Sequence, residues 1–68
     1  MKDFEYTQRV NSVIKDFRSI STNDYGTILL LADFMKSNYD NGDDDIANIY
    51  YDAISIVCKE HMKKEGGF

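Results

Sequence analysis

The chain has 68 residues, a formal net charge of −4 and one cysteine, with twelve acidic side chains against eight basic ones. A chain of this length has room for one domain and buries only about 60% of the surface that its unfolded form exposes. The basic residues are few and scattered, so we expect no direct binding to nucleic-acid phosphates. A single cysteine also excludes a disulfide framework.

Several features predict a cytoplasmic protein. The lone thiol of Cys58 favours a reducing compartment. The first residues carry acids and lack the apolar run of a signal peptide. The most apolar stretch, 27–35, is interrupted by Asp33 and is much shorter than the roughly 20 residues of a membrane span, so we expect no membrane role. Frequent Asn, Asp, Ile, Lys and Tyr favour an AT-rich source such as a phage or plasmid.

The apolar spacing predicts a first helix over residues 3–18. Its apolar positions recur every three or four residues and form one stripe: Tyr6, Val10, Val13, Ile14 and Phe17. Acidic residues in its first turn suit the positive end of the helix dipole.

A second helix is predicted over residues 22–38. Ser21, with Asp24 three residues later, resembles a capping box that would start it. Its expected main stripe is Tyr25, Ile28, Leu31, Ala32, Met35 and Tyr39. Leu30 and Phe34 project on the opposite side, so this helix is apolar nearly all round. Such a helix is either the centre of a bundle or half of an interface.

A third helix is predicted over residues 44–64, after a polar turn that contains an Asn-Gly pair. Its apolar face is expected to be Ile46, Ile49, Tyr50, Ala53, Ile54 and Val57. Acids at its start, lysines near its end and a Gly-Gly pair after it mark both ends. Tyr51, Ile56 and Met62 flank the apolar face and add surface that one core does not readily use.

These elements predict an all-α protein, a compact three-helix bundle in one domain over residues 1–68, which self-association could complete. The chain carries no repeat, no strand-like alternation and no linker. A small helical bundle rarely encloses a substrate pocket, and no phosphate-binding loop is present, so we expect no enzyme activity and no cofactor.

Two candidate ligand sites are weaker than their structural alternatives. If Gly42 took the glycine position of an EF-hand loop, Tyr39 and Asn48 would occupy positions that need acidic ligands, so we interpret the acidic turn as a helix cap. Cys58 and His61 lie three residues apart on one helical face, but no further Cys or His completes a zinc site. We therefore expect no metal site.

Two segments of the chain resemble parts of known protein families. Residues 17–21 (Phe-Arg-Ser-Ile-Ser) are similar to part of the Hha/YmoA family, as are Asn38 and Tyr39 followed by Asp43, Asp44, Tyr51 and Ala53. That family's Asp-His-Arg run and C-terminal Trp are absent. Residues 42–45 (Gly-Asp-Asp-Asp) and the closing Gly-Phe resemble colicin nuclease immunity proteins, without their Tyr-Tyr-Pro segment. Each resemblance implies a small helical protein that docks on a larger partner, and neither assigns a family.

The leading hypothesis is a small regulator or inhibitor that docks an apolar, tyrosine-bearing helical face on a protein target with a basic surface. The contact residues predicted for it are Leu30, Phe34, Tyr51, Ile56, Asp43, Asp44 and Asp45. One alternative is an acidic mimic of nucleic acid, with Asp24, Asp33 and Asp52 joining the carboxylates of residues 40–45. The other is a homodimer or larger homo-oligomer whose spare apolar faces pair with each other.

Overall fold

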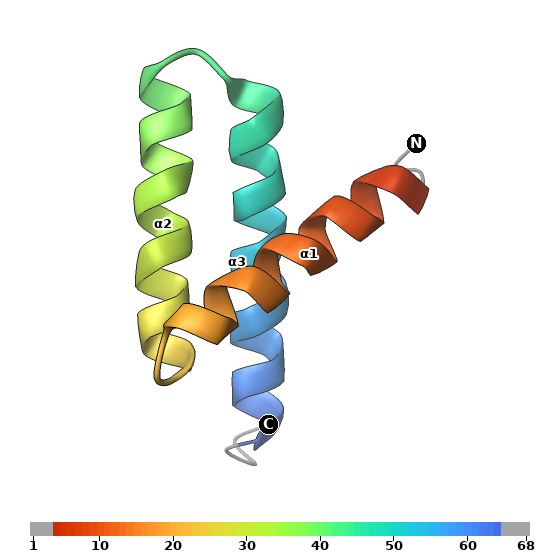
Figure 1. Cartoon of the computed structure of the whole chain (residues 1–68), viewed down its shortest axis with the longest axis vertical. Helices are drawn as coiled ribbons and strands as arrows, with labels where there is room; N and C mark the ends of the chain where they lie inside the picture. The colour runs from red at the N-terminus through yellow and green to blue at the C-terminus, as the bar shows by residue number, and fades with distance from the viewer. Residues whose placement is uncertain (1–3, 65–68) are drawn as a thin grey trace.

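The computed structural model describes residues 4–64 as three helices: α1 (Phe4–Ile20), α2 (Asp24–Asp40) and α3 (Asp44–Lys64). Figure 1 shows α2 and α3 as an antiparallel hairpin, while α1 crosses obliquely over α3 and its N-terminal half points away from α2. The described residues contain no strand, so the prediction of an all-α three-helix bundle is confirmed. None of these helices is both long enough and apolar enough to cross a lipid bilayer.

The predicted helix bounds need small corrections. The third helix has the predicted bounds, but α1 ends at Ile20 instead of residue 18, and α2 runs over 24–40 instead of 22–38. The predicted first residue of the first helix, Asp3, lies outside the described residues.

The start of α2 explains part of this shift. Asn23 is the N-cap residue, and its side-chain oxygen accepts a hydrogen bond from the backbone N–H of Gly26 at 2.9 Å. The predicted capping box of Ser21 and Asp24 is therefore wrong. The Ser21 hydroxyl instead lies 2.8 Å from the carbonyl oxygen of Phe17 and beside the Thr27 hydroxyl, and its one proton serves one of these two acceptors at a time. Ser21 thus ties the end of α1 to the first turn of α2.

The end of α2 is a Schellman motif that turns the chain into α3. The backbone N–H of Gly42 donates to Tyr39, and that of Asp43 donates to Asn38, which satisfies two terminal carbonyls. Gly42 has a φ of +84°, a left-handed conformation that glycine adopts at no steric cost. The Asn-Gly pair in the sequence therefore sets the sharp reversal between the hairpin helices.

The core combines one face of each helix. Its buried residues are Val10 and Ile14 of α1, Thr27 and Leu31 of α2, and Ala47, Ile49, Ala53 and Val57 of α3. On α2 the buried face is rotated from the predicted stripe. Thr27, which lies outside that stripe, is buried, while Tyr25 and Tyr39 at the ends of the stripe are exposed. Thr27 enters the core because its hydroxyl is satisfied locally by the Asn23 carbonyl.

Candidate functional site

The oblique course of α1 leaves an open groove along its flank, where it meets the N-terminal half of α3. We call this the α1–α3 groove and define it by Glu5, Arg9 and Val13 of α1 with Ile46, Ile49 and Tyr50 of α3. Two adjoining hollows form it, and they share Glu5, Arg9, Ile46 and Ile49. The larger measures about 640 Å³ and is open to solvent. An open groove does not enclose a small substrate, whereas it can accept a segment of another protein.

The floor of the α1–α3 groove is apolar and accessible. Ile46 was predicted to face the core, but its side chain is 45% exposed because α1 turns away before covering this part of α3. Val13 and Tyr50 are half-buried against the core cluster, and Ile49 is buried. A row of apolar side chains along a groove is a surface that a partner could remove from water.

An aromatic cluster extends this floor toward α2. The ring of Phe34 stacks on that of Tyr50, with centroids 5.8 Å apart, and meets the ring of Phe17 edge-on at 5.2 Å. Phe34 is 47% exposed, although these two rings support it. An exposed aromatic ring held rigidly by neighbouring rings loses little entropy when a partner covers it.

A hydrogen bond between α1 and α3 lies beside the smaller hollow of the groove, which Tyr6 and Asn48 help to line. The hydroxyl of Tyr6 donates to a carboxylate oxygen of Asp52 and also lies 3.2 Å from the carbonyl oxygen of Asn48. This contact anchors the projecting half of α1 on α3. The wall of the groove is thus fixed before any partner arrives.

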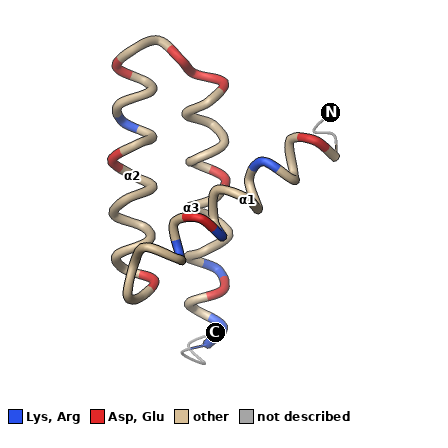
Figure 2. The backbone as a smooth tube through the Cα atoms, viewed as in Figure 1, with Lys and Arg blue, Asp and Glu red and all other residues tan. Residues whose placement is uncertain are grey.

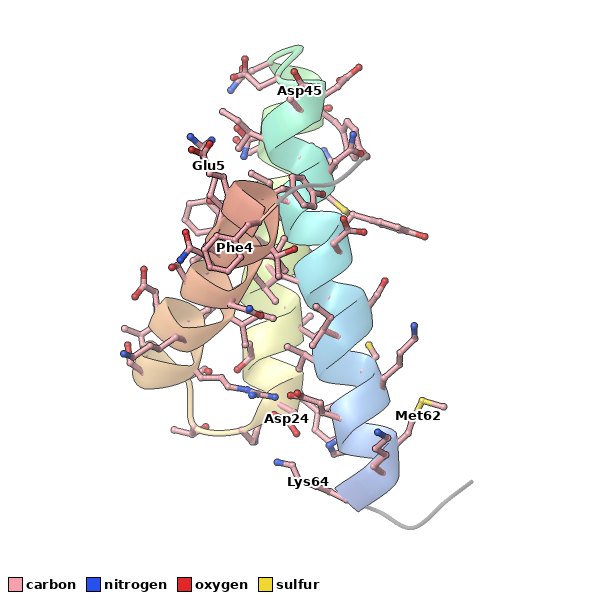
Figure 3. The ribbon with its side chains drawn as sticks, turned by 90° about the vertical axis from the view of Figure 1, so that its right-hand side faces the viewer. Phe4, Glu5, Asp24, Asp45, Met62 and Lys64 are labelled. Carbon is pink, nitrogen blue, oxygen red and sulfur yellow. The ribbon has the colours of Figure 1, made fainter. Side chains whose placement is uncertain are left out.

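Carboxylates surround the upper part of the groove. Asp43, Asp44 and Asp45 precede Ile46 directly, and Ile46 lies on the border between the groove and the acidic turn. Figure 2 shows this acidic turn between α2 and α3, and Figure 3 shows Glu5 at the start of α1 near the same end as Asp45. We call Glu5, Asp43, Asp44 and Asp45 the acidic rim. Of the described residues that line the groove and the acidic turn, Arg9 alone carries a positive charge.

The predicted contact residues do not share one surface. Phe34 lies at the α2 end of the groove and Asp43, Asp44 and Asp45 lie on its rim, whereas Ile56 is half-buried against the core and Leu30 is half-buried on α2. Tyr51 is 57% exposed, but it follows Tyr50 by one position and so points about 100° away from the groove. Sequence reasoning missed Val13 and Ile46 as accessible residues, because both fit the apolar stripes of their helices.

A cluster of charged side chains joins the other end of the hairpin. The Asp24 carboxylate is only 10% exposed and lies 3.0 Å from Nδ1 of His61 and 3.2 Å from Nζ of Lys64, which Figure 3 shows below it. The hydrogen bond from His61, followed by that from Lys64, lowers the pKa of Asp24 below its ordinary value. Arg18 adds a 2.7 Å ion pair with Glu60. These contacts clamp the first turn of α2 and the end of α1 to the last turns of α3.

The clamp gives His61 a structural role. Its ring pairs with Asp24 and meets the ring of Tyr25 edge-on at 5.0 Å. Cys58 is a half-buried free thiol. Over residues 4–64, no group of three or more His, Cys, Asp and Glu side chains is placed to hold a metal ion.

The contacts of Asp24 and Asp52 weaken the hypothesis that the protein mimics nucleic acid. Asp24 is held by His61 and Lys64, and Asp52 accepts the hydroxyl of Tyr6, so both carboxylates are committed within the protein. A phosphate mimic needs carboxylates that face a partner. Two of the acids assigned to that hypothesis therefore do not suit it.

Comparison with protein-family models, with curated proteins and with solved structures finds no match for this chain. Its function must therefore be argued from its own residues.

Proposed function

We propose that this protein is a small, non-enzymatic protein-binding module that regulates or inhibits its target by docking through the α1–α3 groove. The observation that carries this proposal is the groove itself: Val13, Ile46 and Tyr50 offer apolar surface to solvent along a wall fixed by Tyr6. Scattered exposed apolar residues are normal on monomeric proteins, whereas a row of them along the floor of a groove indicates an interaction site. A cytoplasmic setting, in keeping with the free thiol of Cys58, belongs to this proposal.

The groove also has the composition of an interface centre. Such centres are enriched in aromatic and apolar side chains, and a charged rim surrounds them. Here Ile46 and Phe34 are the most exposed of the apolar groups along the groove floor and aromatic cluster, and the acidic rim lies next to Ile46. We assign the two side chains the role of anchors, and the rim carboxylates the role of steering the partner.

The test is a comparison of capture by three immobilised proteins from a lysate of the organism that encodes the chain. The wild type is compared with Ile46→Ser, which removes the apolar group in the groove, and with Leu29→Ser, which removes an equally apolar group that is 67% exposed on α2. A protein captured by the wild type and Leu29→Ser but lost with Ile46→Ser supports docking through the groove. Equal capture by all three, with circular dichroism showing intact folds, contradicts it.

A specific observation also favours a second candidate, self-association through the side of the hairpin that α1 does not cover. Tyr39 donates to the side chain of Asn48 across the two helices and is exposed, as is Tyr51, one turn beyond Asn48. Figure 3 shows Met62 on the side of α3 that faces away from α1. A molar mass equal to that of one chain at micromolar concentration would exclude this candidate.

A further inference from the structure

The kind of partner that fits the α1–α3 groove follows from its charge and from its walls. Within residues 4–64, the lining of the groove and of the acidic turn contains four carboxylates and one guanidinium, that of Arg9. The dipole of α3 offsets part of this negative charge, because Asp44 and Asp45 lie in the first turn of that helix. The excess that remains favours a partner that brings positive charge to this end of the groove.

The walls of the groove determine the backbone conformation that a partner can adopt. Both walls are α-helices, whose backbone N–H and C=O groups are paired within the helix except in the end turns, so they offer no continuous edge to an extended strand. A partner backbone that leaves water in this groove is therefore most stable when it satisfies its own hydrogen bonds. An α-helix does so and presents a stripe of apolar side chains to the floor.

We infer that the α1–α3 groove binds a basic amphipathic α-helix of a partner protein, an inference that rests on the proposed function. The apolar stripe of this helix covers Val13, Ile46 and Tyr50, and its Lys or Arg side chains face the acidic rim. From Glu5 to Phe17 the flank of α1 spans about 18 Å, which accommodates roughly twelve residues, or three turns, of a partner helix.

The charge of the rim also sets the direction of the bound helix. The N-terminus of a helix carries a partial positive charge from its unpaired N–H groups. The partner helix therefore lies with its N-terminus next to Asp43, Asp44 and Asp45, and its C-terminus toward Phe34. Its basic residues are concentrated in its first turns.

The experiment uses two fluorescent peptides of about 14 residues with the same leucine stripe, one carrying lysines and the other glutamates at every remaining position. Binding to the whole protein is followed by fluorescence anisotropy at low and at physiological salt. The lysine peptide is expected to bind at least tenfold more tightly than the glutamate peptide, and salt is expected to weaken its binding.

Substitutions in the protein test whether the lysine peptide binds in the groove. Ile46→Ser is expected to lower the affinity of the protein for the lysine peptide at least tenfold. The double variant Glu5→Gln/Asp45→Asn is expected to lower this affinity at least fivefold. The matched double variant Asp33→Asn/Asp40→Asn removes the same charge outside the groove and should change the affinity less than twofold.

Three results would overturn the inference, and they separate it from the proposed function. If the glutamate peptide binds equally well and Ile46→Ser abolishes its binding, the groove is a docking site but its partner is not basic. If the two double variants lower the affinity for the lysine peptide equally, the peptide is attracted by the overall charge of the protein, and attraction to the acidic rim is refuted. If neither peptide binds, the inference of a helical partner is refuted. The proposed function is then decided independently by whether the wild type captures a target that Ile46→Ser does not.

Discussion

Two leucines on α2 allow the packing of the fold to be tested with a matched pair of substitutions. Leu31 is completely buried among the core residues, whereas Leu29, two positions earlier, is 67% exposed. Leu31→Ala and Leu29→Ala change the helix propensity by the same amount, because they make the same substitution inside the same helix. Any difference between them in the free energy of unfolding therefore reports burial.

The expected difference is large for so small a protein. Replacing a buried leucine with alanine costs about 2–5 kcal/mol, from lost transfer free energy and from the cavity that remains. Substitution of an exposed residue such as Leu29 should change stability by no more than about 0.5 kcal/mol. A chain of 68 residues has a total stability of roughly 3–10 kcal/mol, so Leu31→Ala removes a large share of it.

Urea denaturation followed by far-UV circular dichroism measures both changes. With a denaturant slope of about 1 kcal/mol per molar urea, the Leu31→Ala midpoint should fall by roughly 2 M or more, while the Leu29→Ala midpoint should stay close to that of the wild type. Equal shifts for the two variants would refute the assignment of Leu31 to the core face of α2.

Three further predictions concern single contacts. Gly42→Ala should cost about 1 kcal/mol in urea denaturation, because alanine is strained at a φ of +84°, and Gly42→Asn should cost less. Because the hydrogen bond from His61 lowers the pKa of Asp24, this carboxylate contributes stability above its ordinary pKa that is lost as the pH falls through its folded pKa. The gap in melting temperature between wild type and Asp24→Asn should therefore narrow below about pH 4, and a constant gap would contradict the linkage. Thr27→Val keeps the buried shape but removes the hydroxyl shared with Ser21, so it should cost about 1–2 kcal/mol, seen as a lower melting temperature.

The fold was predictable where local signals agreed. The third helix has strong apolar periodicity, acids at its start and lysines at its end, and its bounds match the prediction. The start of the second helix was misplaced because the segment before it contains several side chains that can cap a helix. Asn23 is the residue that caps the helix, while Ser21 is engaged by Phe17 and Thr27, and the order of residue types does not distinguish these roles.

The buried face of α2 could not be predicted from the spacing of its apolar residues. This helix is apolar nearly all round, so its sequence does not single out one buried stripe. Packing against both α1 and α3 buries Thr27 and Leu31 and leaves Tyr25 and Leu29 exposed. A polar residue such as Thr27 is not expected in a core unless its hydroxyl finds a partner, and here the Asn23 carbonyl in the preceding turn provides one.

The candidate site was predictable only in part. The acidic turn and Phe34 stand out in the sequence, but the groove depends on the direction in which α1 crosses α3, which no local pattern encodes. Ile46 continues the apolar stripe of α3 and would be buried if α1 ran parallel to the hairpin. Its exposure is therefore a consequence of tertiary geometry.

The most direct test of the docking groove is the footprint of the captured target on the isotope-labelled protein, measured by NMR. Docking through the groove predicts that the largest chemical-shift changes occur at Val13, Ile46, Ile49 and Tyr50, with smaller changes on the rim at Asp45. Changes concentrated at Tyr51, Ser55 and Met62, with the groove residues unaffected, would contradict it and assign binding to the opposite side of the hairpin.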